Sequence, residues 1–137
     1  AQKVVWLQTH SDHLEKGIEE ALTYYFNKSD SVLVEGNSFL HTHNADICIL
    51  VTTPREAKIK RSTRQIMPKI DLAVINKYAD DSTDDISKAR ERLHHIGCYA
   101  PVFVISPLQK NYNPNKVFLN HIKETIGQPV QSYSESV

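Results

Sequence analysis

The sequence predicts an α/β fold of three layers, in which helices cover both faces of a mostly parallel, five-stranded sheet. Short runs of β-branched and aliphatic residues alternate with longer segments whose apolar residues recur every three or four positions. The connections between these runs are long enough for helical crossovers, which join parallel strands. The 137 residues are expected to form a single α/β domain over residues 1–130, followed by a flexible tail at residues 131–137.

Three strands and one helix are expected in the first part of the sequence. The run Lys3–Leu7 is β-branched and aromatic, which favours a strand. Asp12 followed by Glu15 is typical of a capped helix start. The next residues carry an apolar stripe with helical spacing: Leu14, Ile18, Ala21, Leu22 and Tyr25. Ser31–Glu35 and Asp46–Thr52 are the following strands, and the nearly continuous apolar run in the second is typical of strands covered on both faces.

The rest of the chain continues the alternation after a basic stretch between Pro54 and Lys69 that has weak helical character. Gly97 is placed to follow the C-cap of a helix, because glycine readily adopts the left-handed conformation required there. Four elements are expected in this part, in order: the strand Ile70–Ile75, the helix Asp84–Ile96, the strand Pro101–Ile105, and a helix that opens at Pro114 and Asn115 and is stopped by Gly127 and Pro129.

Charge and cysteine content restrict the classes of function. The formal net charge is zero, so a broad electrostatic attraction to nucleic acid or to a membrane surface is not expected. No apolar run approaches the roughly 20 residues that span a bilayer, and no signal peptide opens the sequence. Cys48 and Cys98 are the two cysteines, and two reduced thiols in a cytoplasmic protein is the expected state.

Polar pairs follow three of the expected strands and form the main candidate site. Glu35 and Gly36 follow one apolar run, Asn76 and Lys77 follow another, and Ser106 and Pro107 follow a third. In open parallel sheets ligands bind in the crevice beyond the carboxyl ends of the strands. An acidic residue there reaches a metal-bound water or a phosphate, so the three pairs predict one ligand-binding edge.

The order of these motifs resembles the later part of a P-loop GTPase domain, over about residues 30–110. The segments LVEGNS, DICILVTTP, DLAVINK and PVFVISPL are most similar to the branch of metallocofactor-assembly GTPases and the molybdopterin-guanine dinucleotide biosynthesis accessory protein. The resemblance implies an incomplete P-loop NTPase fold, GTP or ATP with Mg²⁺ as the cofactor, and a role in metal or molybdenum cofactor assembly. It assigns Glu35 as the catalytic acid and implies the following nucleotide contacts: Gly36, Asn76, Lys77, Ser106 and Pro107.

Two departures from that family limit what is expected of this chain. The guanine-reading motif places an aspartate two positions after the lysine, where this chain has Ala79, and Asp80 comes one position late. No G-x-x-x-x-G-K-[ST] phosphate loop occurs in the sequence. Three explanations stay open: a piece of a longer protein, a relative that has lost nucleotide binding, or a coincidence among doubly wound folds. The parent would be a nucleoside-triphosphate hydrolase, and this chain alone is expected to be inactive.

A second class of function stays open beside nucleotide binding. A non-catalytic α/β interaction domain would keep the scaffold without the site, with a protein partner or a second copy covering a sheet edge. A flavodoxin-like or receiver-like domain is a weaker third option, since neither the acidic pair nor the phosphorylatable aspartate of a receiver is evident.

Two further clusters have both a functional and a structural interpretation. The basic stretch includes Arg55 and Lys69 and is the best anion-binding candidate outside the strand edge, through Lys58, Lys60, Arg61 and Arg64 near Ser62 and Thr63. Such a run is also typical of a solvated face. His41 and His43 are candidate metal ligands, although a zinc or nickel site needs three or four converging ligands.

Overall fold

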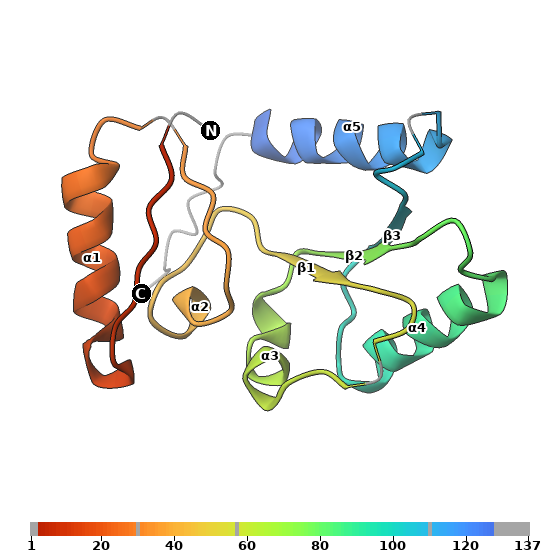
Figure 1. Cartoon of the computed structure of the whole chain (residues 1–137), viewed down its shortest axis with the longest axis horizontal. Coiled ribbons are helices and arrows are strands. Elements are labelled where there is room, and N and C mark those ends of the chain that lie inside the picture. The colour runs from red at the N-terminus through yellow and green to blue at the C-terminus, as the bar shows by residue number, and fades with distance from the viewer. Residues whose placement is uncertain (1–2, 30, 57, 110, 128–137) are drawn as a thin grey trace, which may run out of the picture. The chain divides into compact units, whose positions relative to one another are not determined.

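The computed structural model describes residues 3–29, 31–56, 58–109 and 111–127. The chain divides into two compact units, and each is described by itself. Unit 1 consists of Ala1–Ala45 with Lys60–Ile66, and unit 2 of Asp46–Ile59 with Met67–Val137. Figure 1 shows the elements of both units. The tail expected at 131–137 and the helix stop expected at Pro129 lie outside the described residues.

Unit 2 is built on a parallel sheet of three strands, which confirms the predicted α/β class. The strands follow the order β1 (Ile49–Thr52), β2 (Leu72–Asn76) and β3 (Val102–Ile105), and both neighbouring pairs run parallel. The central strand is almost entirely buried, as expected for the middle of a parallel sheet. The expectation of five strands was wrong for the described residues, because only these three segments form a ladder.

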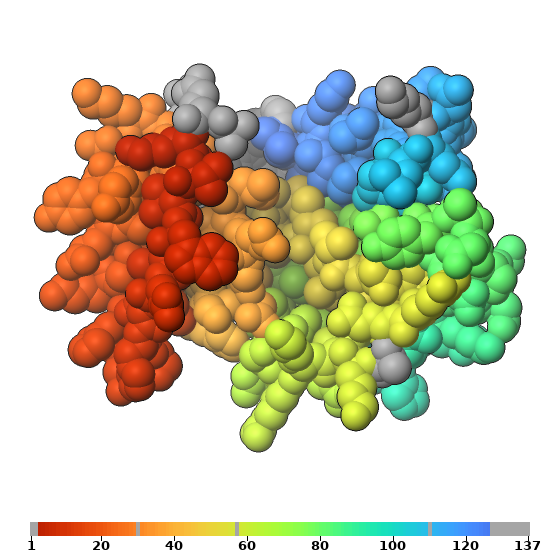
Figure 2. Space-filling view, viewed as in Figure 1, coloured from red at the N-terminus to blue at the C-terminus, as the bar shows by residue number. Residues whose placement is uncertain are grey.

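The two missing strands are Lys3–Leu7 and Ser31–Glu35, which adopt no regular structure. A strand is stabilised by ladder hydrogen bonds to a neighbour, and neither segment pairs with a strand within the described ranges. Their apolar side chains are accordingly exposed: Trp6 is 89% exposed and Leu33 is 98% exposed. Figure 2 shows the first of these segments, in red, on the surface of unit 1.

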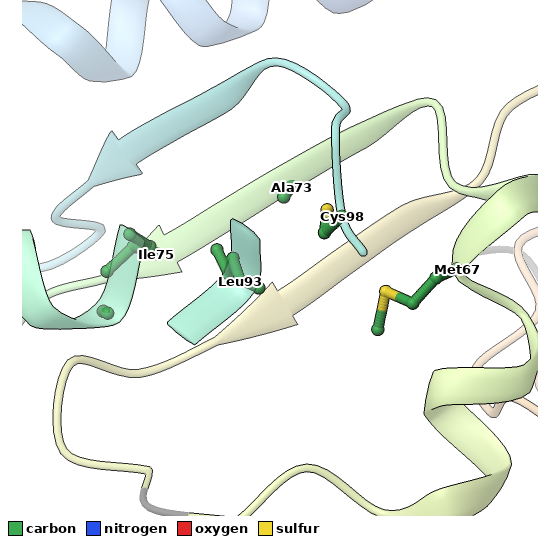
Figure 3. Packing of buried hydrophobic residues seen from close by; sticks show 6 residues of the cluster. Met67, Ala73, Ile75, Leu93 and Cys98 are labelled. Atoms are coloured by element: carbon green, nitrogen blue, oxygen red, sulfur yellow. The ribbon is translucent and has the colours of Figure 1, made fainter. Parts of the chain in front are cut away.

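Helices lie on both faces of the sheet in unit 2. α4 (Thr83–His95) packs Ala89 and Leu93 against one face of β2, in a core that also holds Met67, Ala73, Ile75 and Cys98. Figure 3 shows this cluster. α5 (Asn113–Gly127) packs against the opposite face, where the ring of Phe103 lies 5.6 Å from that of Phe118. Successive residues of a strand point to opposite faces, so β3 contributes side chains to both layers. The short helix η2 (Met67–Lys69) precedes β2.

Both ends of α4 are closed by hydrogen bonds that the sequence encodes locally. The Ser82 hydroxyl accepts from the Asp85 N–H, and the Asp85 carboxylate accepts from the Ser82 N–H, which is a capping box. At the other end Gly97 has a φ of 87°. The Gly97 N–H bonds to the His94 carbonyl and the next N–H to Leu93, a Schellman motif. The predicted place of Gly97 is confirmed.

Unit 1 is helical and contains four short elements: η1 (Ser11–His13), α1 (Leu14–Tyr25), α2 (Phe39–Thr42) and α3 (Arg61–Gln65). The start of α1 differs from the prediction. Its N-cap is His13, without a side-chain capping hydrogen bond, so the pairing of Asp12 with Glu15 was wrong. The preceding extended segment packs on α1 at Gly17, where a Cβ would meet Leu7 and Thr9 at 3.5 Å.

Candidate functional site

Two of the three predicted strand-end pairs come together at the carboxyl edge of the sheet in unit 2. Asn76, the last residue of β2, is in register with Ile105, the last residue of β3. The Lys77 N–H then donates to the Ile105 carbonyl at 2.9 Å. The Asn76–Lys77 pair and the Ser106–Pro107 pair are therefore neighbours. This is the edge at which open parallel sheets bind ligands.

Asn76, Lys77 and Tyr112 are the side chains at this edge that remain available to a ligand. The Asn76 amide makes no side-chain hydrogen bond within the described ranges and is half-buried. The Lys77 ammonium lies 5.3 Å from the centre of the Tyr112 ring, which is a cation–π contact. The sequence did not single out Tyr112, because an aromatic residue in the loop before α5 carries no motif of its own.

Ser106 holds the turn that follows β3. Ser106 is buried, with only 1% of its surface exposed. Its N–H donates to Asn115 Oδ1 at 2.8 Å and its carbonyl accepts from Asn115 Nδ2 at 2.9 Å. Both backbone groups are thus occupied, while the following Pro107 is exposed. The assignment of this pair as nucleotide contacts stays a prediction, and Pro107 is its accessible member.

Arg55 joins the loop after β1 to the loop after β2 through two acids. Its Nη2 donates to Asp80 Oδ2 at 2.7 Å, and its Nε lies 2.8 Å from Asp81 Oδ1. The Asp81 side chain is fully buried, and its Oδ2 accepts the Tyr78 N–H at 2.7 Å. The contact between Asp81 Oδ1 and Arg55 is an ion pair outside hydrogen-bond alignment, since that oxygen accepts no hydrogen bond from the residues described.

The pKa values of this ion pair follow from its contacts. The hydrogen bond from Arg55 holds the pKa of Asp80 below its ordinary value. The same bond raises the pKa of Arg55. Both groups are therefore charged at neutral pH. Arg55, which the sequence placed in an anion-binding stretch, is engaged with these two carboxylates instead.

Glu35 and Gly36 lie in unit 1 and not at the end of a strand. Glu35 is the exposed last residue of an irregular segment, and a bend and turn follow it from Gly36. Gly36 has a φ of 126°, which a glycine adopts without strain. Its neighbour Asn37 donates from Nδ2 to Ser62 Oγ at 2.9 Å and to Thr63 Oγ1 at 3.1 Å. The expectation that Glu35 is a strand-end carboxylate was wrong, because residues 31–35 have no strand partner within the described ranges.

The predicted anion-binding residues are divided between the two units. Lys58 belongs to unit 2, whereas Lys60, Arg61 and Arg64 belong to unit 1. All four residues are exposed. In unit 1, the Asn37 amide fixes the two hydroxyls that lie between Arg61 and Arg64 in the sequence. The role of these basic residues in binding an anion stays a prediction.

One of the two histidines proposed as metal ligands, His43, makes contacts of another kind. The His43 ring stacks on Phe39 at 5.1 Å, and its Nδ1 lies 2.8 Å from the Thr42 hydroxyl. Across the described ranges no three His, Cys, Asp or Glu side chains come together in a way that fits a metal ion. A site at His41 and His43 would therefore need a further ligand from elsewhere.

Comparisons with protein-family models, with curated proteins and with solved structures gave no match to this chain. The function is therefore argued from the residues and their geometry. In the ranges that the structure describes, none of the helices combines the length and the apolar character that a membrane crossing requires.

The two thiols are buried within unit 2, and no disulfide joins Cys48 to Cys98. Burial raises the pKa of the Cys98 thiol above its ordinary value. A neutral, buried thiol is a poor nucleophile, so neither geometry nor protonation favours Cys98 as a catalytic group.

Proposed function

We propose that this chain is a nucleotide-binding, GTPase-like α/β domain linked to metal or molybdenum cofactor assembly. The base would bind at the carboxyl edge of the sheet in unit 2. The observation that carries the proposal is the juxtaposition there of Asn76 and Lys77 with the turn after β3. In the family that the sequence resembles, the matching motifs contact the nucleotide base.

The available side chains suit a purine. The Asn76 amide offers a donor and an acceptor to the edge of a base. The Lys77 ammonium already lies over an aromatic ring, that of Tyr112, and the aliphatic stem of a lysine can pack along the face of a base. Both residues come from the end of the most buried strand, so their backbone is held rigidly. Rigid placement lowers the entropic cost of binding.

The phosphate end of the nucleotide has no matching cradle in this chain. Phosphates are held by a series of backbone N–H groups in a glycine-rich loop and by a lysine, and the sequence has no such loop. In this proposal the base contacts belong to unit 2 and the phosphate contacts come from another segment or protein. The chain alone is then expected to bind nucleotides weakly and to hydrolyse none.

Saturation-transfer NMR with millimolar nucleotide tests the proposal at the affinity that it predicts. Transfer from the protein to the base protons of GDP and ADP is expected for the unaltered chain. Asn76→Ala removes the amide and is expected to abolish most of that transfer. Lys123→Ala, which alters an exposed lysine of α5, is the matched control and is expected to retain it.

Two outcomes would overturn the proposal. One is the absence of transfer to any base proton at millimolar nucleotide. The other is an unchanged signal in Asn76→Ala, which would place the nucleotide elsewhere on the molecule. Calorimetric titration with GTP, ATP and Mg²⁺ adds a separate measure, because micromolar affinity in this chain would contradict an external phosphate cradle.

One observation favours a second candidate, a non-catalytic α/β interaction domain. The outer edge of β1 pairs with no strand within the described ranges. Two apolar side chains of that strand are also exposed, since Ile49 is 38% and Val51 61% accessible. An open apolar edge is a site at which another strand can add. Under this alternative the Asn76→Ala substitution would leave partner binding intact.

A further inference from the structure

The two acids that follow β2 decide which base the proposed site can read. In the sequence Asn76-Lys77-Tyr78-Ala79, the residue two positions after the lysine has no polar side chain. The next carboxylates along the sequence are those of Asp80 and Asp81. Their geometry therefore determines whether a carboxylate is available at this edge of the sheet.

Asp80 is held away from this role by Arg55. Its Oδ2 accepts from Arg55 Nη2 at 2.7 Å, a short charge-assisted hydrogen bond. That bond also keeps the pKa of Asp80 below its ordinary value. A ligand that used this oxygen would have to displace a guanidinium that also contacts Asp81. The Asp80 side chain is 71% exposed, so its other oxygen is a solvated acceptor and not a buried one.

Asp81 is held still more firmly. Its side chain has no exposed surface. One carboxylate oxygen accepts the Tyr78 N–H at 2.7 Å, and the other lies 2.8 Å from Arg55 Nε. These contacts fold the loop back on itself directly after Lys77. Asp81 therefore has a structural role in this loop and is closed to a ligand.

Guanine is distinguished from hypoxanthine by its 2-amino group. The N1–H and the 2-amino group are adjacent donors, and a carboxylate that accepts both is the usual means of selecting guanine in a protein site. A site built to accept a donor rejects the analogue that lacks it by a large factor, because a buried acceptor is then left unpaired. Without that acceptor the discrimination disappears.

We infer that the base site of unit 2 does not select guanine, and that guanine and hypoxanthine nucleotides bind to it equally well. The inference rests on the proposed function and names its ligand class as purine nucleotides read through Asn76 and Lys77. Arg55 is the specificity-determining residue, since it occupies one oxygen of Asp80, the carboxylate that follows Lys77 most closely in the sequence and is exposed.

Paired titrations with GDP and IDP test this inference, because the two nucleotides differ only in the 2-amino group. Dissociation constants from saturation-transfer NMR are expected to agree within about threefold in the unaltered chain. Asp80→Asn removes the charge of the exposed acid at constant size, and the ratio of the two constants is expected to stay the same. Asp84→Asn, in the first turn of α4, is the matched control.

The possible failures are distinguishable. A preference for GDP of about tenfold or more that Asp80→Asn abolishes would overturn the inference and leave the proposed function standing. The absence of transfer to the base protons of both nucleotides would overturn the proposed function, and the inference with it. Equal binding of GDP and IDP in the unaltered chain and in Asp80→Asn supports both.

Discussion

Asn115 bonds to both backbone groups of Ser106. Its Oδ1 accepts the Ser106 N–H at 2.8 Å, and its Nδ2 donates to the Ser106 carbonyl at 2.9 Å. Ser106 is the first residue after β3, and Asn115 lies in the first turn of α5. The intervening loop carries Tyr112, which lies beside Lys77. A residue outside the proposed base site thus fixes the loop that forms one side of it.

Asn115→Ala is expected to lower the free energy of unfolding by about 1–3 kcal/mol, because the buried Ser106 groups lose their partner. Urea denaturation followed by circular dichroism measures the change. Asn115→Asp keeps the acceptor for the Ser106 N–H but loses the donor to the Ser106 carbonyl. Its stability is therefore expected to lie between those of the wild type and Asn115→Ala. Wild-type stability in Asn115→Ala would show that solvent replaces the amide without cost.

Ser82→Ala is expected to destabilise the protein by about 0.5–2 kcal/mol, because it removes the N-cap acceptor of α4. Ser87→Ala provides the matched control, since Ser87 is exposed within the same helix and makes no cap. Thermal unfolding of the two variants compares them directly. Equal melting temperatures would contradict the capping role.

The capping box is also expected to weaken in acid. Hydrogen bonds from the Ser82 hydroxyl and N–H hold the pKa of Asp85 below its ordinary value. A carboxylate whose pKa is lower in the folded state contributes stability above its unfolded pKa, and that contribution is lost as the pH falls through the folded pKa. Asp85→Asn is therefore expected to be less stable than wild type at neutral pH. The stability of the wild type is expected to fall toward that of the variant below about pH 4. Denaturation series at several pH values test this, and a difference that persists unchanged in acid would contradict it.

The two acids bound to Arg55 are expected to differ in their importance for stability. Asp81→Ala removes a fully buried carboxylate and the acceptor of the Tyr78 N–H, which is expected to cost about 1–3 kcal/mol. Asp80→Ala alters an exposed side chain, and its stability is expected to stay close to that of wild type. Chemical denaturation of both variants decides the matter. The reverse order would mean that the exposed ion pair, and not the buried one, holds the loop.

Amide hydrogen exchange is expected to alternate along β1. The carbonyl of Cys48 bonds to β2, and the bonding residues of a parallel strand alternate. Leu50 and Thr52 therefore direct their N–H groups to β2, and Ile49 and Val51 direct theirs away from it. NMR exchange rates are expected to be at least about tenfold faster at the latter two. Equal protection of all four amides would indicate that another chain covers the outer edge of β1. Dilution would then dissociate that chain and restore fast exchange at Ile49 and Val51.

The elements of unit 2 were predicted well because their signals are local. The apolar run of β2 is long enough to mark a strand buried on both faces, and the parallel arrangement follows from the length of its connections. The end of α4 follows from Gly97 alone. Boundaries shifted by one to three residues, as at β1, which was expected from Asp46 and begins at Ile49.

What the sequence could not supply was the partner of each segment. Residues 3–7 and 31–35 have the composition of strands, yet a strand exists only where a neighbour accepts its hydrogen bonds. The predicted role of Glu35 depended on such a neighbour. The contacts of Arg55 with Asp80 and Asp81 join residues about 25 positions apart in the sequence and have no periodicity, so no pattern in the residues could indicate them.

Trp6 gives this chain an optical label of its own. It is the sole tryptophan of the sequence and stands almost fully in solvent on the irregular segment before α1. Its fluorescence therefore begins at the long-wavelength limit of a hydrated indole. Any strand or protein that comes to cover this segment will shift the emission to shorter wavelengths, so complex formation can be followed in real time without a dye.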